Sequence, residues 1–277
     1  MAAPDLHIHS TASDGRLTPE EIVALALERG VPAIAITDHD SVDGVGPALR
    51  AAEGTGLTVV PGVELSAAVG IRGIHILGYC IDHTDPVLLD RLTELRHTRI
   101  DRARRIVDAL ADAGIDVTLD DVLTLAGDGA VGRAHVARVI VEAGHASSVS
   151  DAFYRLLGEG RPFFVPKPLP KPPEVVSLIR EAGGIAVVAH PALSRIDDLV
   201  PVLVDAGVVG IEVYHARHDE PTAARYARLA AEYGLIATGG SDFHTDDDRD
   251  NSLGSAPVPP ETVDRLLEAC RLQASIA

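Results

Sequence analysis

Short apolar segments alternate with helical segments over most of this 277-residue chain, and this alternation constrains its fold more than any other feature. We expect strands at 6–8, 33–37, 57–60, 71–79, 185–189, 208–213 and 235–238. Apolar strands joined by helices predict a parallel sheet with helices on both faces. About seven such units predict an α/β fold, a distorted (β/α)7 barrel, whose functional groups gather at the C-terminal ends of the strands.

The middle of the chain departs from this alternation. From about residue 85 to residue 161 the pattern is helical, with helices expected at 90–113, 119–126, 135–143 and 149–157. The proline-rich segment 162–173 then predicts an extended return. We therefore predict a barrel in two parts, residues 1–84 and 165–277, interrupted by a small helical subdomain at residues 85–164.

Charge and cysteine content limit the partners and the compartment. The chain carries 24 Lys+Arg against 41 Asp+Glu, so we expect neither a large nucleic-acid surface nor an anionic membrane as partner. It shows no signal peptide and no run of 18 apolar residues, which predicts a cytoplasmic protein. Cys80 and Cys270 are expected to be two separate buried side chains in a reducing compartment. The oligomeric state is left open.

Histidines and acidic residues collect at the ends of the expected strands. The chain has 12 histidines. The strand-end set comprises His7, His9, Asp14, His39, Glu64, His75, His190, Glu212, His215, Asp242 and His244. A lone histidine at such a position is more often structural than a ligand. In His7-x-His9, however, the period of two places both rings on one face of the strand.

Packing so many imidazoles and carboxylates at one barrel mouth is costly unless a cation compensates. Imidazole and carboxylate ligands without cysteine suit Zn, Mn or Fe. A structural zinc site needs only four ligands, so the larger set predicts two or three divalent metal ions.

The same residues stand in motifs that resemble the PHP (polymerase and histidinol phosphatase) superfamily of metal-dependent phosphoesterases. These motifs are HxH at 7–9, Asp14, TDHD at 37–40, GVE at 62–64, GxHxLGY at 73–79, AHP at 189–191 and GSDFH at 240–244. The match covers nearly the whole chain and implies a distorted PHP barrel. The helical insertion is similar to that of the subgroup acting on nucleoside 3',5'-bisphosphates and on the 5' ends of short RNA.

This resemblance implies a trinuclear site. His7, His9, Glu64 and Asp242 would hold the first ion, the bridging Glu64 with His75 and His190 the second, and Asp14, His39 and His244 the third. Asp38 and Asp40 flank His39 and are expected to orient ligand rings, although a capping role for Asp40 is equally open.

The metals suggest the mechanism. Water bridged between divalent ions loses a proton near neutral pH and attacks phosphorus. His215 is the candidate general acid, with a structural role as its alternative.

The insertion is expected to bind substrate phosphate through Arg133, His135 and Lys167. Arg133 and His135 open a helix and are similar to an Arg-x-His stretch of the nucleotide-acting subgroup. Lys167 lies in the return segment, where a solvated linker lysine is the alternative.

The leading hypothesis is a phosphoesterase that hydrolyses a phosphate monoester of a small nucleotide, such as adenosine 3',5'-bisphosphate, or trims the 5' ends of short RNA. The alternative is a histidinol-phosphate phosphatase or another small-molecule phosphatase. An amidohydrolase is less favoured, because it needs a bridging lysine at a strand end and the two lysines, Lys167 and Lys171, lie in the return segment. A non-catalytic PHP module is disfavoured by the intact ligand set.

Overall fold

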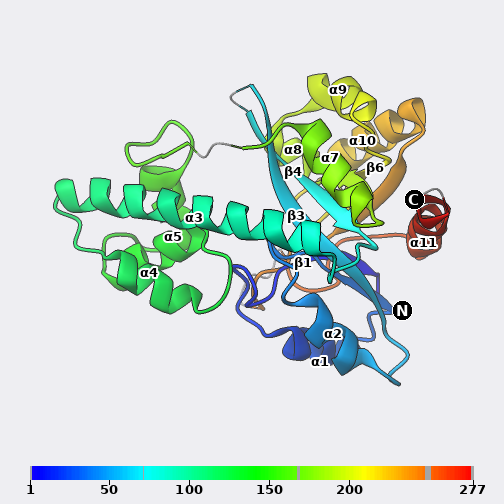
Figure 1. Ribbon diagram of the computed structural model, residues 1–277, viewed down its shortest axis with the longest axis horizontal. Coiled ribbons are helices and arrows are strands. Elements are labelled where there is room, and N and C mark those ends of the chain that lie inside the picture. The colour runs from blue at the N-terminus through cyan, green and yellow to red at the C-terminus, as the bar shows by residue number, and fades with distance from the viewer. Residues whose placement is uncertain (1, 71, 167–168, 247–250, 276–277) are drawn as a thin grey trace. The chain divides into compact units, whose positions relative to one another are not determined.

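The computed structural model describes residues 2–70, 72–166, 169–246 and 251–275 (Figure 1). Within them, one sheet follows chain order: β1 (Asp5–Ile8), β2 (Ala33–Ile36), β3 (Thr58–Val69), β4 (Arg72–Tyr79), β5 (Ile185–Val188), β6 (Gly210–His215) and β7 (Ile236–Gly240). Ile8 pairs with Phe243 just beyond β7, which brings the two edges of the sheet together. The sheet is therefore nearly closed, and the expected distorted (β/α)7 barrel is confirmed.

The expected parallel order is wrong for β4, which runs antiparallel to both β3 and β5. A tight turn at Gly70, with φ of 63°, joins β3 to β4 and places Val69 opposite Arg72. Without a helix between them the chain must reverse. β3 is also longer than expected, so Glu64 lies within the strand rather than at its end.

Helices flank the sheet of the barrel. Figure 1 shows α1 (Pro19–Arg29) and α2 (Val45–Ala52) on one side, and α7 (Pro172–Glu181), α8 (Pro191–Ser194), α9 (Val200–Asp205) and α10 (Glu220–Tyr233) on the other. A short 3-10 turn, η2 (Asp197–Leu199), leads into α9. The start of α1 is set by a capping box between Thr18 and Glu21. α7 was not predicted, because its opening prolines lie in the segment expected to form an extended return, although proline suits the first turn of a helix.

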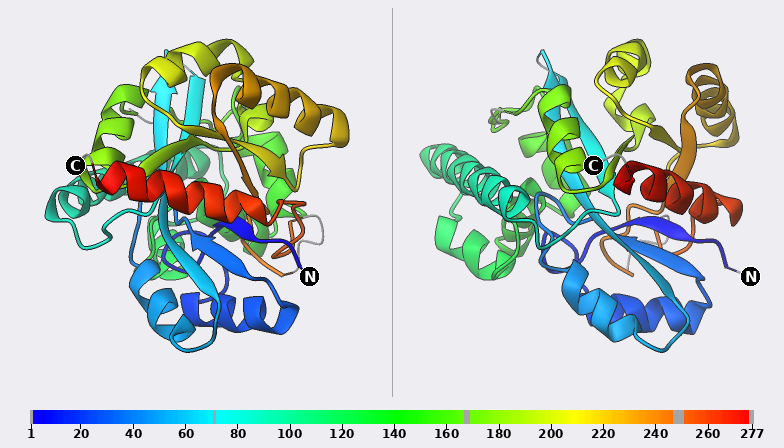
Figure 2. Two further views of the ribbon diagram at one scale, coloured as in Figure 1. Left: turned by 90° about the vertical axis from the view of Figure 1, so that its right-hand side faces the viewer. Right: turned by 45° about the vertical axis from the view of Figure 1, so that its right-hand side comes forward.

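The C-terminal helix α11 (Glu261–Ala274) joins the core of the barrel (Figure 2). Its Leu266 and Cys270 belong to one apolar cluster with Leu6, Ala35, Val60, Leu77, Tyr79, Ile185, Val187 and Ala189. Cys270 is disulfide-bonded to Cys80 at the end of β4, so the expectation of two separate thiols was wrong. The cysteines therefore no longer support the expected reducing compartment, because disulfides persist mainly in oxidising surroundings.

The chain separates into two compact units, which we call the barrel unit (Met1–Leu89 with Leu169–Ala277) and the helical unit (Asp90–Pro168). α3 (Pro86–Asp112) runs into the helical unit, which continues through α4 (Leu119–Ala126), α5 (Arg133–Glu142), α6 (Val149–Ala152) and the π-helical turn η1 (Phe153–Leu157). It has an apolar core of its own, centred on residues such as Leu110, Val136 and Ile140. In the part of the chain that the structure describes, none of the helices combines the length and apolar character needed to cross a bilayer.

Candidate metal centre

Glu64 of β3 stands at the centre of the histidine cluster. Its Oε2 lies 3.3 Å from Nε2 of His7, 3.2 Å from Nε2 of His9 and 3.0 Å from Nδ1 of His39. Its Oε1 lies 2.7 Å from Nδ1 of His75 and 3.0 Å from Nε2 of His190. One fully buried carboxylate therefore contacts five imidazoles that come from four different segments of the chain.

The topology explains this convergence. β1 carries His7, and His9 follows its end, so both rings point to the same side. His39 follows β2 and bridges to Glu64, while His190 follows β5 and opens α8. His75 lies in the middle of β4, and because β4 is reversed, it lies beside Ala189, just past the end of β5.

A second carboxylate, Asp242, enters from the loop after β7. Its Oδ1 lies 3.2 Å from Nε2 of His9, 3.6 Å from Nε2 of His7 and 3.7 Å from Nδ1 of His244. The buried carboxylate of Asp5 holds this loop by accepting hydrogen bonds from Ser241 N–H at 2.8 Å and Ser241 Oγ–H at 2.6 Å. The loop is thus fixed from behind, with Asp242 directed at the histidines.

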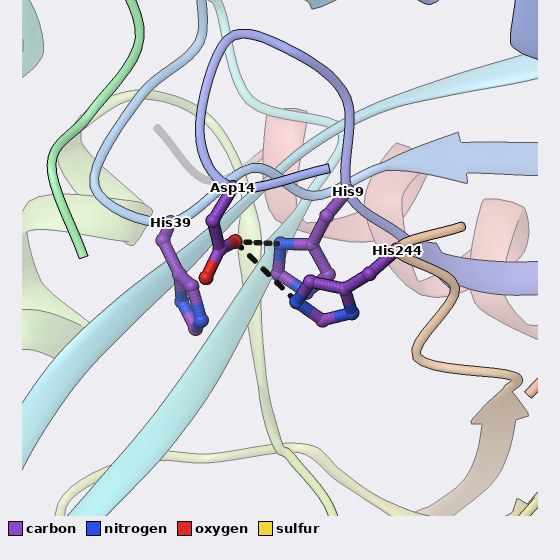
Figure 3. Close-up of side chains that lie close together, drawn as sticks. All are labelled: His9, Asp14, His39 and His244. Atoms are coloured by element: carbon purple, nitrogen blue, oxygen red, sulfur yellow. Dashed lines mark ion pairs between the residues drawn. The ribbon is translucent and has the colours of Figure 1, made fainter. Parts of the chain in front are cut away.

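The third carboxylate, Asp14, lies close to three histidines, His9, His39 and His244 (Figure 3). Its Oδ1 lies 3.3 Å from Nε2 of His244 and 3.9 Å from Nδ1 of His9. Donor atoms of His9, Asp14, His39 and His244 all lie within 4.8 Å of one another, a separation that suits ligands of one ion. Asp14, Glu64 and Asp242 with His7, His9, His39, His75, His190 and His244 form what we call the imidazole–carboxylate cluster.

The electrostatics of this cluster favour ionised carboxylates. Burial acts to raise the pKa of Glu64, but His39, His75 and His7 hold it well below its usual range. Burial acts to lower the pKa of His9, yet Asp242 and Glu64 raise it to about 10. Burial lowers the pKa of His39 to about 4 in spite of the Glu64 carboxylate, so this ring stays neutral and keeps a lone pair.

The donor set fits divalent cations. Nε2 of His7 and of His9, Nδ1 of His39 and Oε2 of Glu64 are buried and face one another, but none makes a hydrogen bond among the described residues. Burying such atoms without partners is costly. Imidazole nitrogens and carboxylate oxygens are ligands that Zn, Mn and Fe accept, so metal ions would satisfy these atoms.

Backbone strain accompanies the cluster. Asp40, His190 and Asp242 have positive φ values of 48°, 26° and 56°. Such conformations are unfavourable for residues with a Cβ and collect at functional sites.

The two aspartates that flank His39 make hydrogen bonds near the cluster. Asp40 Oδ1 accepts a hydrogen bond from Ser66 N–H at 3.3 Å. Asp38 accepts a hydrogen bond from Ser13 Oγ–H at 2.6 Å. The same Ser13 Oγ lies 3.5 Å from Nδ1 of His9, so Ser13 connects Asp38 to the His9 ring.

His215 and Glu212 of β6 lie beside the cluster. Nε2 of His215 is 3.8 Å from Oδ2 of Asp242, and its Nδ1 accepts a hydrogen bond from Arg217 N–H at 3.1 Å. Both oxygens of Glu212 lie 3.1 Å from Nδ1 of His7. Glu212 was among the strand-end acids expected from the sequence, without a predicted role. A carboxylate within the apolar strand GIEVYH was the signal for a buried polar contact.

In the helical unit, Arg133 opens α5 and its guanidinium contacts two aromatic rings. Its Cζ lies 5.4 Å from the ring centre of Phe153 and 5.6 Å from that of Phe164. Arg102 lies over Phe164 from α3, at 5.6 Å, and lines one small cavity together with Arg99 and Arg133. We call Arg99, Arg102, Arg133, Phe153 and Phe164 the arginine–aromatic cluster. Burial, followed by Arg133 and Arg99, lowers the pKa of Arg102 to about 9.

The other two predicted substrate contacts have different outcomes. Nδ1 of His135 accepts a hydrogen bond from Gly132 N–H at 3.0 Å, which caps the start of α5. Lys167 lies outside the described residues.

Residues 5–157 match the family model described as PHP domain. The chain belongs to the PHP family. Three of the relatives that this chain matches are covered over most of their length. A 5'-3' exoribonuclease of Haemophilus influenzae is 39% identical over 87% of this chain and 89% of its own, and a 3',5'-nucleoside bisphosphate phosphatase of Chromobacterium violaceum is 34% identical over 94% of both chains. A phosphoribosyl 1,2-cyclic phosphate 1,2-diphosphodiesterase of Eggerthella lenta is 34% identical over 87% of this chain and 93% of its own.

Solved structures also share this PHP fold. One from Bifidobacterium adolescentis, described as a predicted metal-dependent phosphoesterase, has a TM-score of 0.88 at 31% identity and covers 96% of both chains. One from Chromobacterium violaceum, described as an amidohydrolase with bound sulfate, has a TM-score of 0.88 at 33% identity, over 98% of this chain and 97% of that one. The resemblance to the PHP family that the motifs indicated is confirmed.

Proposed function

We propose that this PHP chain is a divalent-metal-dependent phosphoesterase acting on small phosphorylated nucleotides or on the 5' ends of short RNA. The carrying observation is the buried Glu64 carboxylate in contact with five imidazoles. The facing nitrogens of His7, His9 and His39 lack a hydrogen bond among the described residues and would accept cations. Family membership and the names of the relatives, an exoribonuclease, a bisphosphate phosphatase and a cyclic phosphodiesterase, support the nucleotide class.

The proposed ligand set divides the cluster among two or three ions. His7, His9, Glu64 and Asp242 would hold one, Glu64 with His75 and His190 a second, and Asp14, His39 and His244 a third. When bound, divalent ions supply Lewis acidity toward water and toward phosphate oxygens. Mn, Zn and Fe all suit these ligands, and the identity of the native metal is a matter for metal analysis.

His215 is the proposed proton donor to the leaving oxygen. Because its Nδ1 accepts the Arg217 N–H, the neutral ring carries its proton on Nε2, the atom that faces Asp242. Hydrolysis forms one P–O bond from water and breaks the P–O bond to the leaving group, whose oxygen needs a proton. An Nε2–H beside the cluster can supply it.

The helical unit is proposed to bind the anionic part of the substrate through Arg133, with His135 and Lys167 as further contacts. Burial and the nearby Arg99 both lower the pKa of the Arg133 guanidinium. A bound phosphate would offset this unfavourable positive charge.

A phosphate-release screen tests the proposal. The protein is stripped with a chelator, reloaded with Mn, Zn or Fe and assayed on adenosine 3',5'-bisphosphate, short 5'-phosphorylated RNA and histidinol phosphate. We expect no turnover without metal, restored turnover with metal, and faster release from the nucleotide or RNA than from histidinol phosphate. Faster release from histidinol phosphate would favour the histidinol-phosphate phosphatase alternative. Hydrolysis of an amide substrate without phosphate release would favour the amidohydrolase alternative.

A further inference from the structure

Glu212 contacts two candidate metal ligands that come from opposite parts of the barrel unit. It lies within β6 and is fully buried. Both of its oxygens are 3.1 Å from Nδ1 of His7, which belongs to β1. Its Oε2 also accepts a hydrogen bond of 2.7 Å from the backbone N–H of His190, which follows β5. One carboxylate therefore connects two segments that each carry a candidate metal ligand.

The contact with His7 determines which ring nitrogen faces the cluster. A carboxylate accepts hydrogen bonds, so Nδ1 of His7 must carry the proton. In the neutral ring, Nε2 is then the nitrogen with a lone pair. That atom lies 3.3 Å from Oε2 of Glu64 and 3.6 Å from Oδ1 of Asp242, in the middle of the proposed ligand set.

The contact with His190 supports a strained backbone. His190 has φ of 26° and ψ of 60°, an unfavourable conformation for a residue with a Cβ. The hydrogen bond to Glu212 fixes its peptide group, and the side chain then places Nε2 at 3.0 Å from Oε1 of Glu64 and 3.2 Å from Nδ1 of His75. Loss of the bond frees this segment to relax away from the cluster.

A separate ion bound by His7, Glu212 and His215 is the competing arrangement, since donor atoms of these three lie within 4.8 Å of one another. Nδ1 of His7 faces Glu212 and therefore carries a proton. Nδ1 of His215 already accepts the N–H of Arg217, so its other nitrogen holds the proton in the neutral ring. Two protonated nitrogens leave Glu212 as a hydrogen-bond acceptor, not as a ligand.

We propose that Glu212 is a positioning residue of the metal centre: it fixes the tautomer of His7 and the backbone of His190, and thereby raises metal affinity without touching the ions. The inference rests on the proposed metal-dependent function. Carboxylates that hold ligating histidines in this way typically contribute about 10- to 100-fold in metal affinity.

The test compares Glu212→Gln and Glu212→Ala with two controls. Glu220→Gln removes an exposed carboxylate at the start of α10. Tyr79→Phe removes a buried hydrogen bond, Tyr79 Oη–H to Leu6 O at 2.7 Å, without touching a candidate ligand. Chelator competition measures the Mn affinity of each full-length protein, and elemental analysis measures metal per chain at saturation. ¹⁵N spectra of the Zn-loaded proteins report which ring nitrogen of His7 carries the proton.

For Glu212→Gln we expect Mn affinity to fall by about 10- to 100-fold, with unchanged metal per chain at saturation and kcat recovered in excess Mn. In Glu212→Ala, Mn affinity should fall at least as far, and His7 should lose its single Nδ1-protonated form. Both controls should bind Mn as the wild type does.

Three outcomes overturn the inference. Wild-type Mn affinity in both variants would remove the positioning role, and the loss of one whole metal equivalent would make Glu212 a ligand. An equal loss in Tyr79→Phe would show general destabilisation. If the wild type itself binds no metal, the proposed function fails, which is distinct from a failure of Glu212 alone.

Discussion

The two units of this chain bury charge in opposite ways. In the barrel unit, the Glu64 carboxylate is surrounded by imidazoles, and after the cost of burial these hold its pKa far below the usual value. In the helical unit, Arg102 is surrounded by other arginines, and burial together with Arg133 and Arg99 lowers its pKa to about 9. One cluster contains mutually attracting charges, and the other contains mutually repelling ones.

This difference indicates what each cluster requires. In the imidazole–carboxylate cluster, buried ring nitrogens and a carboxylate oxygen face one another without hydrogen bonds among the described residues, and divalent cations would satisfy them. In the arginine–aromatic cluster, burial and neighbouring arginines lower the pKa of Arg102, and the proposed substrate phosphate would relieve this repulsion. Each cluster is built within its own unit. Substitutions that reverse either balance therefore test the comparison.

The largest effect is expected for Glu64→Gln. The amide removes the carboxylate charge that contacts five imidazoles, so we expect metal binding to fail and phosphate release to drop by about 1000-fold or more. Glu174→Gln on α7, which removes an exposed carboxylate, is the matched control and should keep full activity. Steady-state kinetics with metal analysis decide the point, and a Glu64→Gln protein that keeps both metal and turnover contradicts the proposed centre.

A smaller and different effect is expected for Arg133→Ala. Loss of a charged contact to phosphate costs about 1.5–3 kcal/mol, which corresponds to a rise in KM for nucleotides of about 10- to 100-fold. Metal affinity should not change, because the barrel unit is untouched. Arg161→Ala, which removes an exposed arginine stacked on Tyr154, is the control. An unchanged KM in Arg133→Ala would remove the helical unit from substrate binding.

The sequence was informative where function depends on strand ends, and less so where it depends on packing. His7, His9, His190 and Asp242 were predicted from their positions next to apolar strands, because barrel topology brings such ends together. Glu212 was left without a role, since its contacts join β6 to β1 and to the segment after β5, a proximity that spacing along the chain cannot show.

Two further errors have the same origin. The Cys80–Cys270 disulfide spans 190 residues, and only the packing of α11 on the barrel brings its ends together. The reversal of β4 depends on the turn at Gly70, while the apolar pattern of a strand is the same in either direction.

The metal-free barrel unit should lose stability as pH rises, by up to about 1.4 kcal/mol per pH unit for one proton. The folded pKa of His9, about 10, exceeds its ordinary value of 6.5. The stabilisation from its proton is therefore fully present below pH 6.5 and is lost as pH rises through 10. Urea unfolding in a chelator, from pH 6.5 to 10, measures this slope. His9→Gln should flatten it, and an equal slope in that variant would assign the proton elsewhere.

The smallest effect separates the two aromatic rings of the helical unit. Phe164 lies under both Arg102 and Arg133, whereas Phe153 lies under Arg133 alone. A cation–π contact contributes about 0.5–1 kcal/mol, so Phe164→Leu should raise the KM for nucleotides by about threefold and Phe153→Leu by less. Both leucine variants keep an apolar side chain in place of the ring. Because the aromatic faces orient guanidinium groups that repel one another, their loss should weaken substrate binding while metal affinity stays constant. If both variants bind nucleotide as the wild type does, the rings support only the fold of the helical unit.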